Sequence, residues 1–171
     1  RYRYRNISVI CRDGERYTRL LSAALKRWDI PAFISEARPV DAEPLMRFVL
    51  SAFDAVNGGW QSDDLLNMLK TGLTAFTAEE IALLENYIFT WGLSGRAAWF
   101  APFEKHPDGY GKPMDEAAEE TLEQLNGLRA RVTAPLQRFS GALRAGDGMS
   151  VSAAVYTLLT DFQIDRTLPE F

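Results

Sequence analysis

The sequence predicts a short α/β start followed by a mainly α-helical remainder, so that the chain is predominantly α overall. Two short runs of β-branched and apolar residues flank one amphipathic segment within residues 1–40. Beyond them, apolar residues recur at helical spacing between breaks that carry glycine and proline. We therefore expect a βαβ-like unit over residues 1–40 and a helical subdomain over residues 41–171.

The predicted α/β unit consists of a strand, a helix and a second strand. Residues 6–12, NISVICR, predict a strand because they are mostly apolar and β-branched, and Cys11 is expected to be buried in it. Residues 15–28 place their large apolar side chains on one side of a helix. Residues 31–35, PAFIS, predict the second short strand. This order usually gives two parallel strands joined by a right-handed crossover.

Helix-start signals divide the next part of the chain. Pro44 opens a helix over PLMRFVLSAFDAV, since proline is tolerated in a first turn. Ser62 is the expected N-cap of the helix SDDLLNMLKT. Thr77 and Glu80 have the spacing of a capping box and open a helix that continues to Trp91.

The last third of the chain predicts a loop and two helices. Residues 93–114 contain glycines, prolines and aromatic residues and predict a long loop. Residues 115–144 repeat apolar residues at alternating spacings of four and three, which indicates one long helix, with Pro135 expected to bend it. Residues 151–164, VSAAVYTLLTDFQI, predict a final helix.

Composition limits the classes of protein that fit. The chain has 171 residues, a net charge of −4 and a pI of about 5.1, which argues against a DNA-binding protein that is basic overall. A single cysteine excludes an internal disulfide framework and fits a reducing compartment. The sequence has no long apolar run, so we expect no membrane span. It starts at Arg1 instead of Met, which suggests a piece of something longer.

Four glutamates share one face of the long predicted helix: Glu116, Glu119, Glu120 and Glu123. Such a stripe resembles the carboxylates of a metal site, but that site needs histidines from partner helices. The one histidine, His106, falls in the predicted loop. A solvated helix face is the favoured interpretation, and we predict no metal-ligating and no catalytic residue in this chain.

The N-terminal segment alternates basic and aromatic residues. Arg1, Arg3 and Arg5 alternate with Tyr2 and Tyr4. Arginines between aromatic rings can contact single-stranded nucleic acid, where the rings stack on bases and the cations neutralise phosphates. Alternation is equally typical of an extended segment with one packed face. The three arginines are therefore nucleic-acid-binding candidates with a structural alternative.

Arg12 stands where the first predicted strand meets a turn. The carboxyl ends of strands are where α/β sheets bind ligands, and an arginine there can hold a phosphate with two hydrogen bonds. An ordinary surface arginine is the equal alternative.

The triplet Lys70-Thr71-Gly72 matches one motif of serine β-lactamases. That motif requires an S-x-x-K nucleophile and an S-D-N element, and neither precedes Lys70. A helix end explains the triplet better, with the lysine near the negative end of the helix dipole and the glycine just beyond it.

Several strings are similar to known DNA-processing proteins. NISVICRDGERYTRLLSAALKRWDIPAFI resembles the start of the second RecA-like domain of UvrD-type superfamily 1 helicases. EPLMRFVLSAFDAV, LLNMLKTGL and IALLENYIFTWGLSGRAAW resemble the AddB (RexB) subunit of bacterial AddAB helicase–nucleases. The resemblance covers nearly the whole chain, and LKTGL is one of its most distinctive parts.

The resemblance implies a role in processing double-strand DNA breaks for recombination. AddAB-type complexes unwind and degrade DNA with ATP, and the implied partners are an AddA-type subunit and DNA, in the bacterial cytoplasm and away from membranes. ATP, Mg²⁺ and an iron–sulfur cluster are implied for the full-length family protein and no cofactor for this piece. Arg12 matches a strand-motif arginine that reaches the nucleotide γ-phosphate in active motors.

Under this interpretation residues 1–40 are part of the second RecA-like domain and residues 41–171 are its helical insertion. The piece itself would be structural, shaping the DNA channel and contacting AddA. Two alternatives remain: a piece of a true UvrD-type motor, and a stand-alone helical module for protein–protein interaction.

Overall fold

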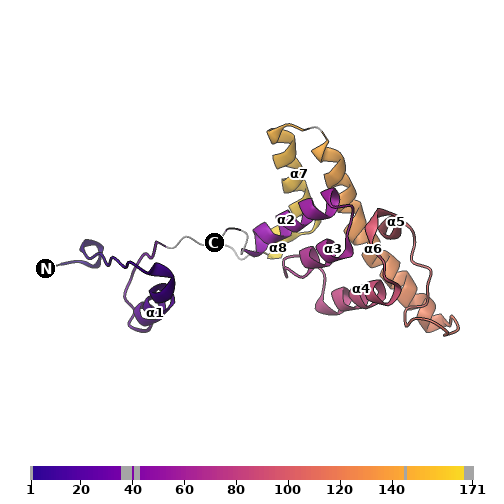
Figure 1. Ribbon diagram of the computed structural model, residues 1–171, viewed down its shortest axis with the longest axis horizontal. Coiled ribbons are helices and arrows are strands. Elements are labelled where there is room, and N and C mark those ends of the chain that lie inside the picture. Colours follow the sequence, from indigo (N-terminus) through magenta and orange to yellow (C-terminus); the bar gives the residue numbers. More distant parts are fainter. Residues whose placement is uncertain (1, 36–39, 41–42, 145, 168–171) are drawn as a thin grey trace. The chain divides into compact units, whose positions relative to one another are not determined.

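The chain forms two units that are described separately, Arg1–Val40 and Asp41–Phe171 (Figure 1). The structure is a computed structural model and describes residues 2–35, 40, 43–144 and 146–167.

The first unit contains a 3-10 helix, η1 (Tyr4–Asn6), and one α-helix, α1 (Gly14–Arg27). Asp13 caps α1, because its Oδ1 accepts a hydrogen bond from the backbone N–H of Arg16 at 3.4 Å. The predicted helix over residues 15–28 is therefore confirmed to within one residue at each end.

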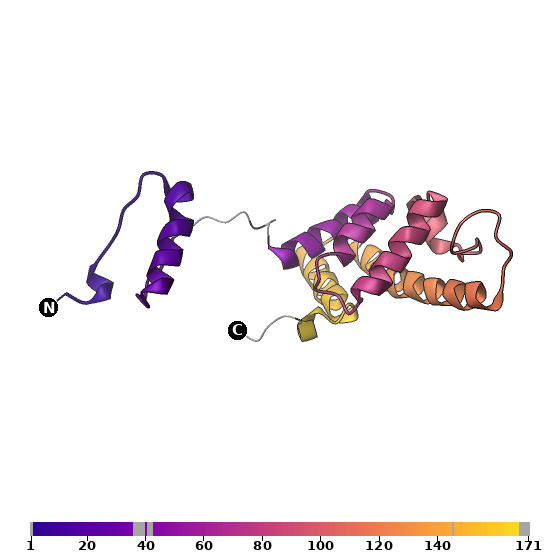
Figure 2. The ribbon, with the colours of Figure 1, turned by 90° about the horizontal axis from the view of Figure 1, so that it is seen from below.

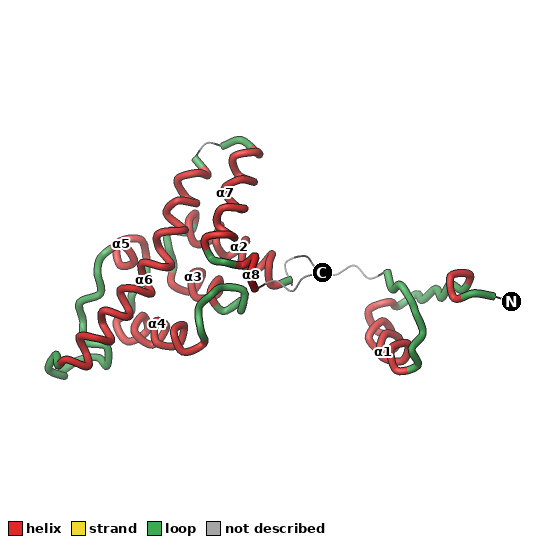
Figure 3. The backbone as a smooth tube through the Cα atoms, turned by 180° about the vertical axis from the view of Figure 1, so that it is seen from behind, coloured by secondary structure: helices red, strands yellow, loops and turns green. Residues whose placement is uncertain are grey.

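The two strands predicted in this unit are wrong. Of the predicted strands at residues 6–12 and 31–35, Asn6 ends η1 and the other residues form no strand, and the described part of the chain contains no strand at all (Figure 3). A strand is held by hydrogen bonds to a neighbouring strand, and neither segment has such a partner among the described residues. Cys11, expected in a buried strand, is exposed, and its thiol donates to the carbonyl oxygen of Asp13 at 3.4 Å.

The second unit consists of helices joined by short connections and one longer loop. In chain order they are α2 (Pro44–Asn57), α3 (Ser62–Leu69), α4 (Ala78–Trp91), α5 (Gly95–Phe100), α6 (Glu116–Leu143), α7 (Gly148–Asp161) and α8 (Ile164–Thr167).

Local signals set most of these helix starts. Pro44 occupies the first turn of α2, as predicted. The capping box of α4 is also confirmed: Thr77 Oγ1 accepts from the N–H of Glu80, while the Glu80 carboxylate accepts from the N–H of Thr77. The N-cap of α3 was predicted wrongly, since Gln61 holds that position and Ser62 is the first helical residue.

One continuous hydrophobic core lies between α2, α3, α4, α5, α6, α7 and α8. The long α6 runs along the unit and contributes buried residues over most of its length, and Figure 2 shows it in orange tones along the lower edge of the unit. The largest fully buried side chains include Trp60, Trp99, Tyr87, Phe48 and Leu125. Burying this much aromatic and aliphatic surface is the main source of stability for the unit.

The predicted loop over residues 93–114 is shorter than expected, because residues 95–100 form α5. The remaining segment joins α5 to α6 at one end of the unit (Figure 2). Side chains of the helices tie it down: the Tyr87 hydroxyl bonds the backbone of Lys105, and Asn126 bonds both backbone groups of Phe103. The segment is thus an ordered connection packed onto α4 and α6.

Candidate functional site

The nucleotide-binding candidate Arg12 lies in the first unit, just before α1. Its side chain is exposed, and the predicted strand end that would have positioned it is not formed. Arg12 therefore stands on an open segment of the chain and not at the edge of a sheet.

Two of the three N-terminal arginines lie within the described residues. Arg1 lies outside the described residues. Arg3 and Arg5 are exposed and flank or enter η1, and Tyr2 and Tyr4 are exposed as well. The described part of this segment is therefore a short 3-10 helix whose side chains are exposed to solvent.

The triplet Lys70-Thr71-Gly72 ends α3. Lys70 is the C-cap and pairs with Glu85 of α4, while the Thr71 hydroxyl donates to the carbonyl oxygen of Met68 at 2.8 Å. Gly72 has a φ of +74°, a conformation that favours glycine. These contacts are those of a helix end tied to the neighbouring helix.

The glutamates Glu116, Glu119, Glu120 and Glu123 all lie on exposed positions of the first two turns of α6. Among the described residues, no three histidine, cysteine, aspartate or glutamate side chains are grouped so that they could hold a metal ion. The acidic residues at the start of α6 complement the positive end of the helix dipole.

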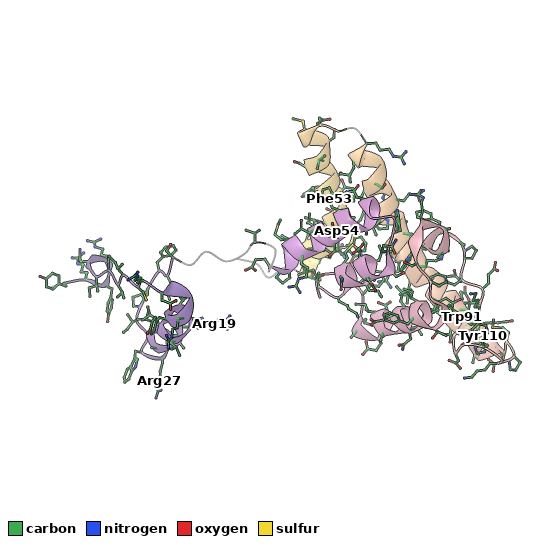
Figure 4. All side chains as sticks on the ribbon, viewed as in Figure 1. Arg19, Arg27, Phe53, Asp54, Trp91 and Tyr110 are labelled. Atoms are coloured by element: carbon green, nitrogen blue, oxygen red, sulfur yellow. The ribbon has the colours of Figure 1, made fainter. Side chains whose placement is uncertain are left out.

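An aromatic cluster at the far end of α4 was not predicted as a unit. Trp91 of α4 donates from Nε1 to the carbonyl oxygen of His106 at 3.1 Å, and its ring lies 4.4 Å from the ring of Tyr110. Figure 4 shows Trp91 and Tyr110 side by side. The Lys105 ammonium lies 4.6 Å from the Trp91 ring centroid, a cation–π contact. The cluster anchors the connection between α5 and α6.

A buried polar link joins α3 to the segment around α5. The Ser62 hydroxyl donates to the carbonyl oxygen of Leu93 at 2.6 Å and accepts from Trp99 Nε1 at 3.0 Å. Arg129 of α6 donates to the carbonyl oxygen of Trp99 at 3.0 Å, and burial lowers the pKa of its guanidinium. These bonds pair buried polar groups and hold α3, α5 and α6 together, which is a structural role.

One side of α7 is exposed to solvent but carries no charged residue. No residue from Gly148 to Thr160 is charged, although α7 has one side open to solvent. Met149 and Tyr156 are 84% and 74% exposed on that side. A count of charged residues in each predicted helix is the signal that could have found this surface from the sequence.

Within the described residues, no helix combines the length and the apolar character needed to cross a membrane.

These features define a helical scaffold whose polar contacts hold elements together. No family model matches the chain. Its relatives among curated proteins are informative. The chain is 32% identical over 170 residues, 99% of its length, to the B-type subunit of the ATP-dependent helicase/deoxyribonuclease from Clostridium novyi. It is 35% and 34% identical to proteins of the same name from Moorella thermoacetica and Pelotomaculum thermopropionicum, over 96% and 98% of its length.

The resemblance to AddB-type subunits is confirmed by these comparisons. The match occupies only 14% to 15% of the length of these three relatives. The chain therefore spans about one seventh of the proteins that it matches. The shared name of those longer proteins states that the helicase/deoxyribonuclease is ATP-dependent.

Proposed function

We propose that this chain is a segment of an AddB-type subunit that acts with an AddA-type subunit in the ATP-dependent processing of double-strand DNA breaks. The observation that supports this is identity of 29% to 35%, over nearly the whole chain, to eight proteins of one name. The longer protein would work in the bacterial cytoplasm, with ATP, Mg²⁺ and an iron–sulfur cluster bound outside this segment.

Within that subunit, we propose a structural role for this segment. Residues 41–171 would form the helical insertion that shapes the DNA channel and contacts the AddA-type subunit, and residues 1–40 would belong to the RecA-like domain that precedes it. The division of the chain near residue 40 supports this assignment. So does the described side-chain chemistry, which links helices to one another instead of converging on a reacting atom.

The test is a reconstitution of the longer polypeptide that carries this segment. Together with an AddA-type subunit it should degrade linear double-stranded DNA in the presence of ATP, and the 171-residue chain alone should release no phosphate from ATP. A stoichiometric hydrolysis rate from the isolated chain would contradict the structural role. Failure of the longer polypeptide to associate with the AddA-type subunit would contradict the assignment to the AddB type.

Arg12 separates this proposal from the alternative of a true motor. We propose that Arg12 reaches a nucleotide only when the first RecA-like domain is present, and that its role there is small. Arg12→Ala in the reconstituted complex should then leave most of the unwinding rate intact. Loss of unwinding in that variant would favour a piece of a UvrD-type motor.

A further inference from the structure

The second unit carries a solvent-facing helix surface without a charged side chain. We call it the α7 outer face. It consists of the exposed residues along one side of α7, namely Met149, Ser152, Ala153, Tyr156, Thr157 and Thr160. The opposite side of α7 packs into the core through Ala154 and Leu158, which are buried.

The absence of charge on this face is unusual for a surface helix. Exposed faces of such helices normally carry lysine, arginine, glutamate or aspartate. The exposed positions of α6 follow that rule, with Glu119, Glu123 and Arg138 among them. On α7 the first charged residue is Asp161 at the last position, and it pairs with Arg138 at 2.9 Å.

The serine and threonine hydroxyl groups of the α7 outer face are already satisfied by their own helix. Ser152 Oγ donates to the carbonyl oxygen of Gly148 at 2.9 Å, and Thr157 Oγ1 donates to that of Ala153 at 2.9 Å. Thr160 Oγ1 donates to the carbonyl oxygen of Tyr156 at 3.1 Å. Each of these hydroxyl protons therefore has a partner within α7. They can be buried against apolar atoms without becoming unpaired, which removes the main cost of burying polar groups.

The shape of the face suits a second helix. Ser152 and Ala153 are small and lie between the larger side chains of Met149 and Tyr156, so another helix can approach closely between the two. The α6–α7 hairpin also projects from the body of the second unit (Figure 1), and the residues of the α7 outer face are exposed. Exposed methionine and tyrosine on one helix face are typical of anchors at protein interfaces.

We propose that the α7 outer face is covered by an apolar α-helix from the part of the longer polypeptide that lies outside these 171 residues. This inference rests on the proposed function, since it requires the chain to be a segment of a longer subunit. The matched relatives place about six sevenths of their length outside the corresponding segment, so a covering helix has ample source.

The chemistry of the face favours a permanent cover over a transient partner, and the length of the relatives beyond this segment favours a cover from the same polypeptide. Interfaces between separately folded proteins keep a polar, water-exposed rim around an apolar centre. The α7 outer face has no charged residue over its whole length from Met149 to Thr160, as expected for a surface that is permanently covered within one polypeptide. A second copy of the chain and the AddA-type subunit are the other occupants that the test must separate.

Hydroxyl-radical footprinting measures the solvent exposure of this face directly, because methionine and tyrosine are among the side chains that such radicals oxidise fastest. The oxidation rates of Met149 and Tyr156 would be measured in three samples: the 171-residue chain, the longer polypeptide, and the longer polypeptide with the AddA-type subunit. Tyr110, which is 84% exposed at the opposite end of the unit, provides the internal reference in the 171-residue chain.

The proposal expects fast oxidation in the 171-residue chain and loss of most of it in the longer polypeptide alone. Protection that appears only with the AddA-type subunit would assign the face to that subunit and overturn the proposal. Protection already present in the isolated chain, or fast oxidation in all three samples, would overturn it as well.

A charge-matched pair of variants gives a second readout. Ala153→Arg places a long cation at the point of closest approach, whereas Gln124→Arg adds the same charge to an exposed position of α6. Ala153→Arg should lower the midpoint of thermal unfolding of the longer polypeptide by several degrees and leave that of the isolated chain nearly unchanged. Equal effects of the two variants in both proteins would contradict the proposal. Association with the AddA-type subunit, measured in parallel, tests the proposed function independently.

Discussion

The two units differ in how far their apolar residues are buried. In the described part of residues 2–35 no side chain is buried, and Ile10, Trp28 and Phe33 are largely exposed. The second unit buries aromatic and aliphatic side chains from most of its helices in one core. Segments of about 40 residues or fewer rarely bury enough surface to be stable alone. The apolar pattern of α1 can be read from the sequence. Whether that apolar side is buried depends on the elements that pack against it.

The largest expected effect contrasts two tryptophans. Trp99→Ala removes a side chain that is 1% exposed and should cost about 3–5 kcal/mol in the free energy of unfolding of the second unit. Trp28→Ala removes one that is 73% exposed and should change it by about 0.5 kcal/mol or less. Urea titration followed by circular dichroism measures both. Equal costs would show that the first unit shares the core of the second.

The next effect tests the buried polar link. Ser62→Ala leaves the Trp99 N–H and the Leu93 carbonyl without their partner, which should cost about 1–3 kcal/mol. Ser152→Ala is the control, because its hydroxyl bonds only its own exposed helix and should matter by less than about 0.5 kcal/mol. If both variants unfold at the same urea concentration as the unmodified chain, Ser62 does not join α3 to α5.

A smaller effect is expected at the start of α4. Thr77→Ala removes the hydroxyl that accepts from the Glu80 N–H and should cost about 1 kcal/mol. Thr77→Ser keeps that oxygen and serves as the matched control. The thermal unfolding midpoint should fall for the alanine variant and stay nearly unchanged for serine. An equal fall in both would mean that the threonine methyl group, not the cap, is what stabilises α4.

The smallest effect concerns pH. Burial, with added repulsion from Asp54 and Asp63, raises the pKa of the Asp64 carboxyl above its ordinary value of 3.8. Between the unfolded and the folded pKa, the folded state binds more protons than the unfolded state, so stability falls as pH rises through that interval. Asp64→Asn should remove that part of the fall. Urea titrations of both proteins between about pH 3.5 and 7 measure it, and parallel pH profiles would contradict the shift.

Sequence reasoning succeeded where the cause of structure is local. The capping box of Thr77 and Glu80, the first-turn Pro44 and the spacing along α6 each depend on residues within a few positions, and all were found. The two strand predictions were wrong because the hydrogen bonds of a strand come from distant segments, and none of the described residues supplies them.

The same limit applies to the polar contacts. Ser62 has the residue type of an N-cap, but its hydroxyl bonds Leu93, a residue 31 positions away, and Gln61 occupies the N-cap position instead. The cluster of Trp91, Tyr110 and Lys105 also joins α4 to a later connection, which no local pattern predicts. The family resemblance was recoverable because short strings carry it without any knowledge of packing.

We expect residues 43–144 and 146–167 to form a self-sufficient helical core and residues 2–35 to lack one. Amide hydrogen exchange of the 171-residue chain tests it most directly, because exchange reports the free energy of local opening. We predict that α4 and the middle of α6 exchange at least about a hundredfold more slowly than α1. Equal protection of α1 and α6 would show that the first unit has a core of its own and would contradict the account.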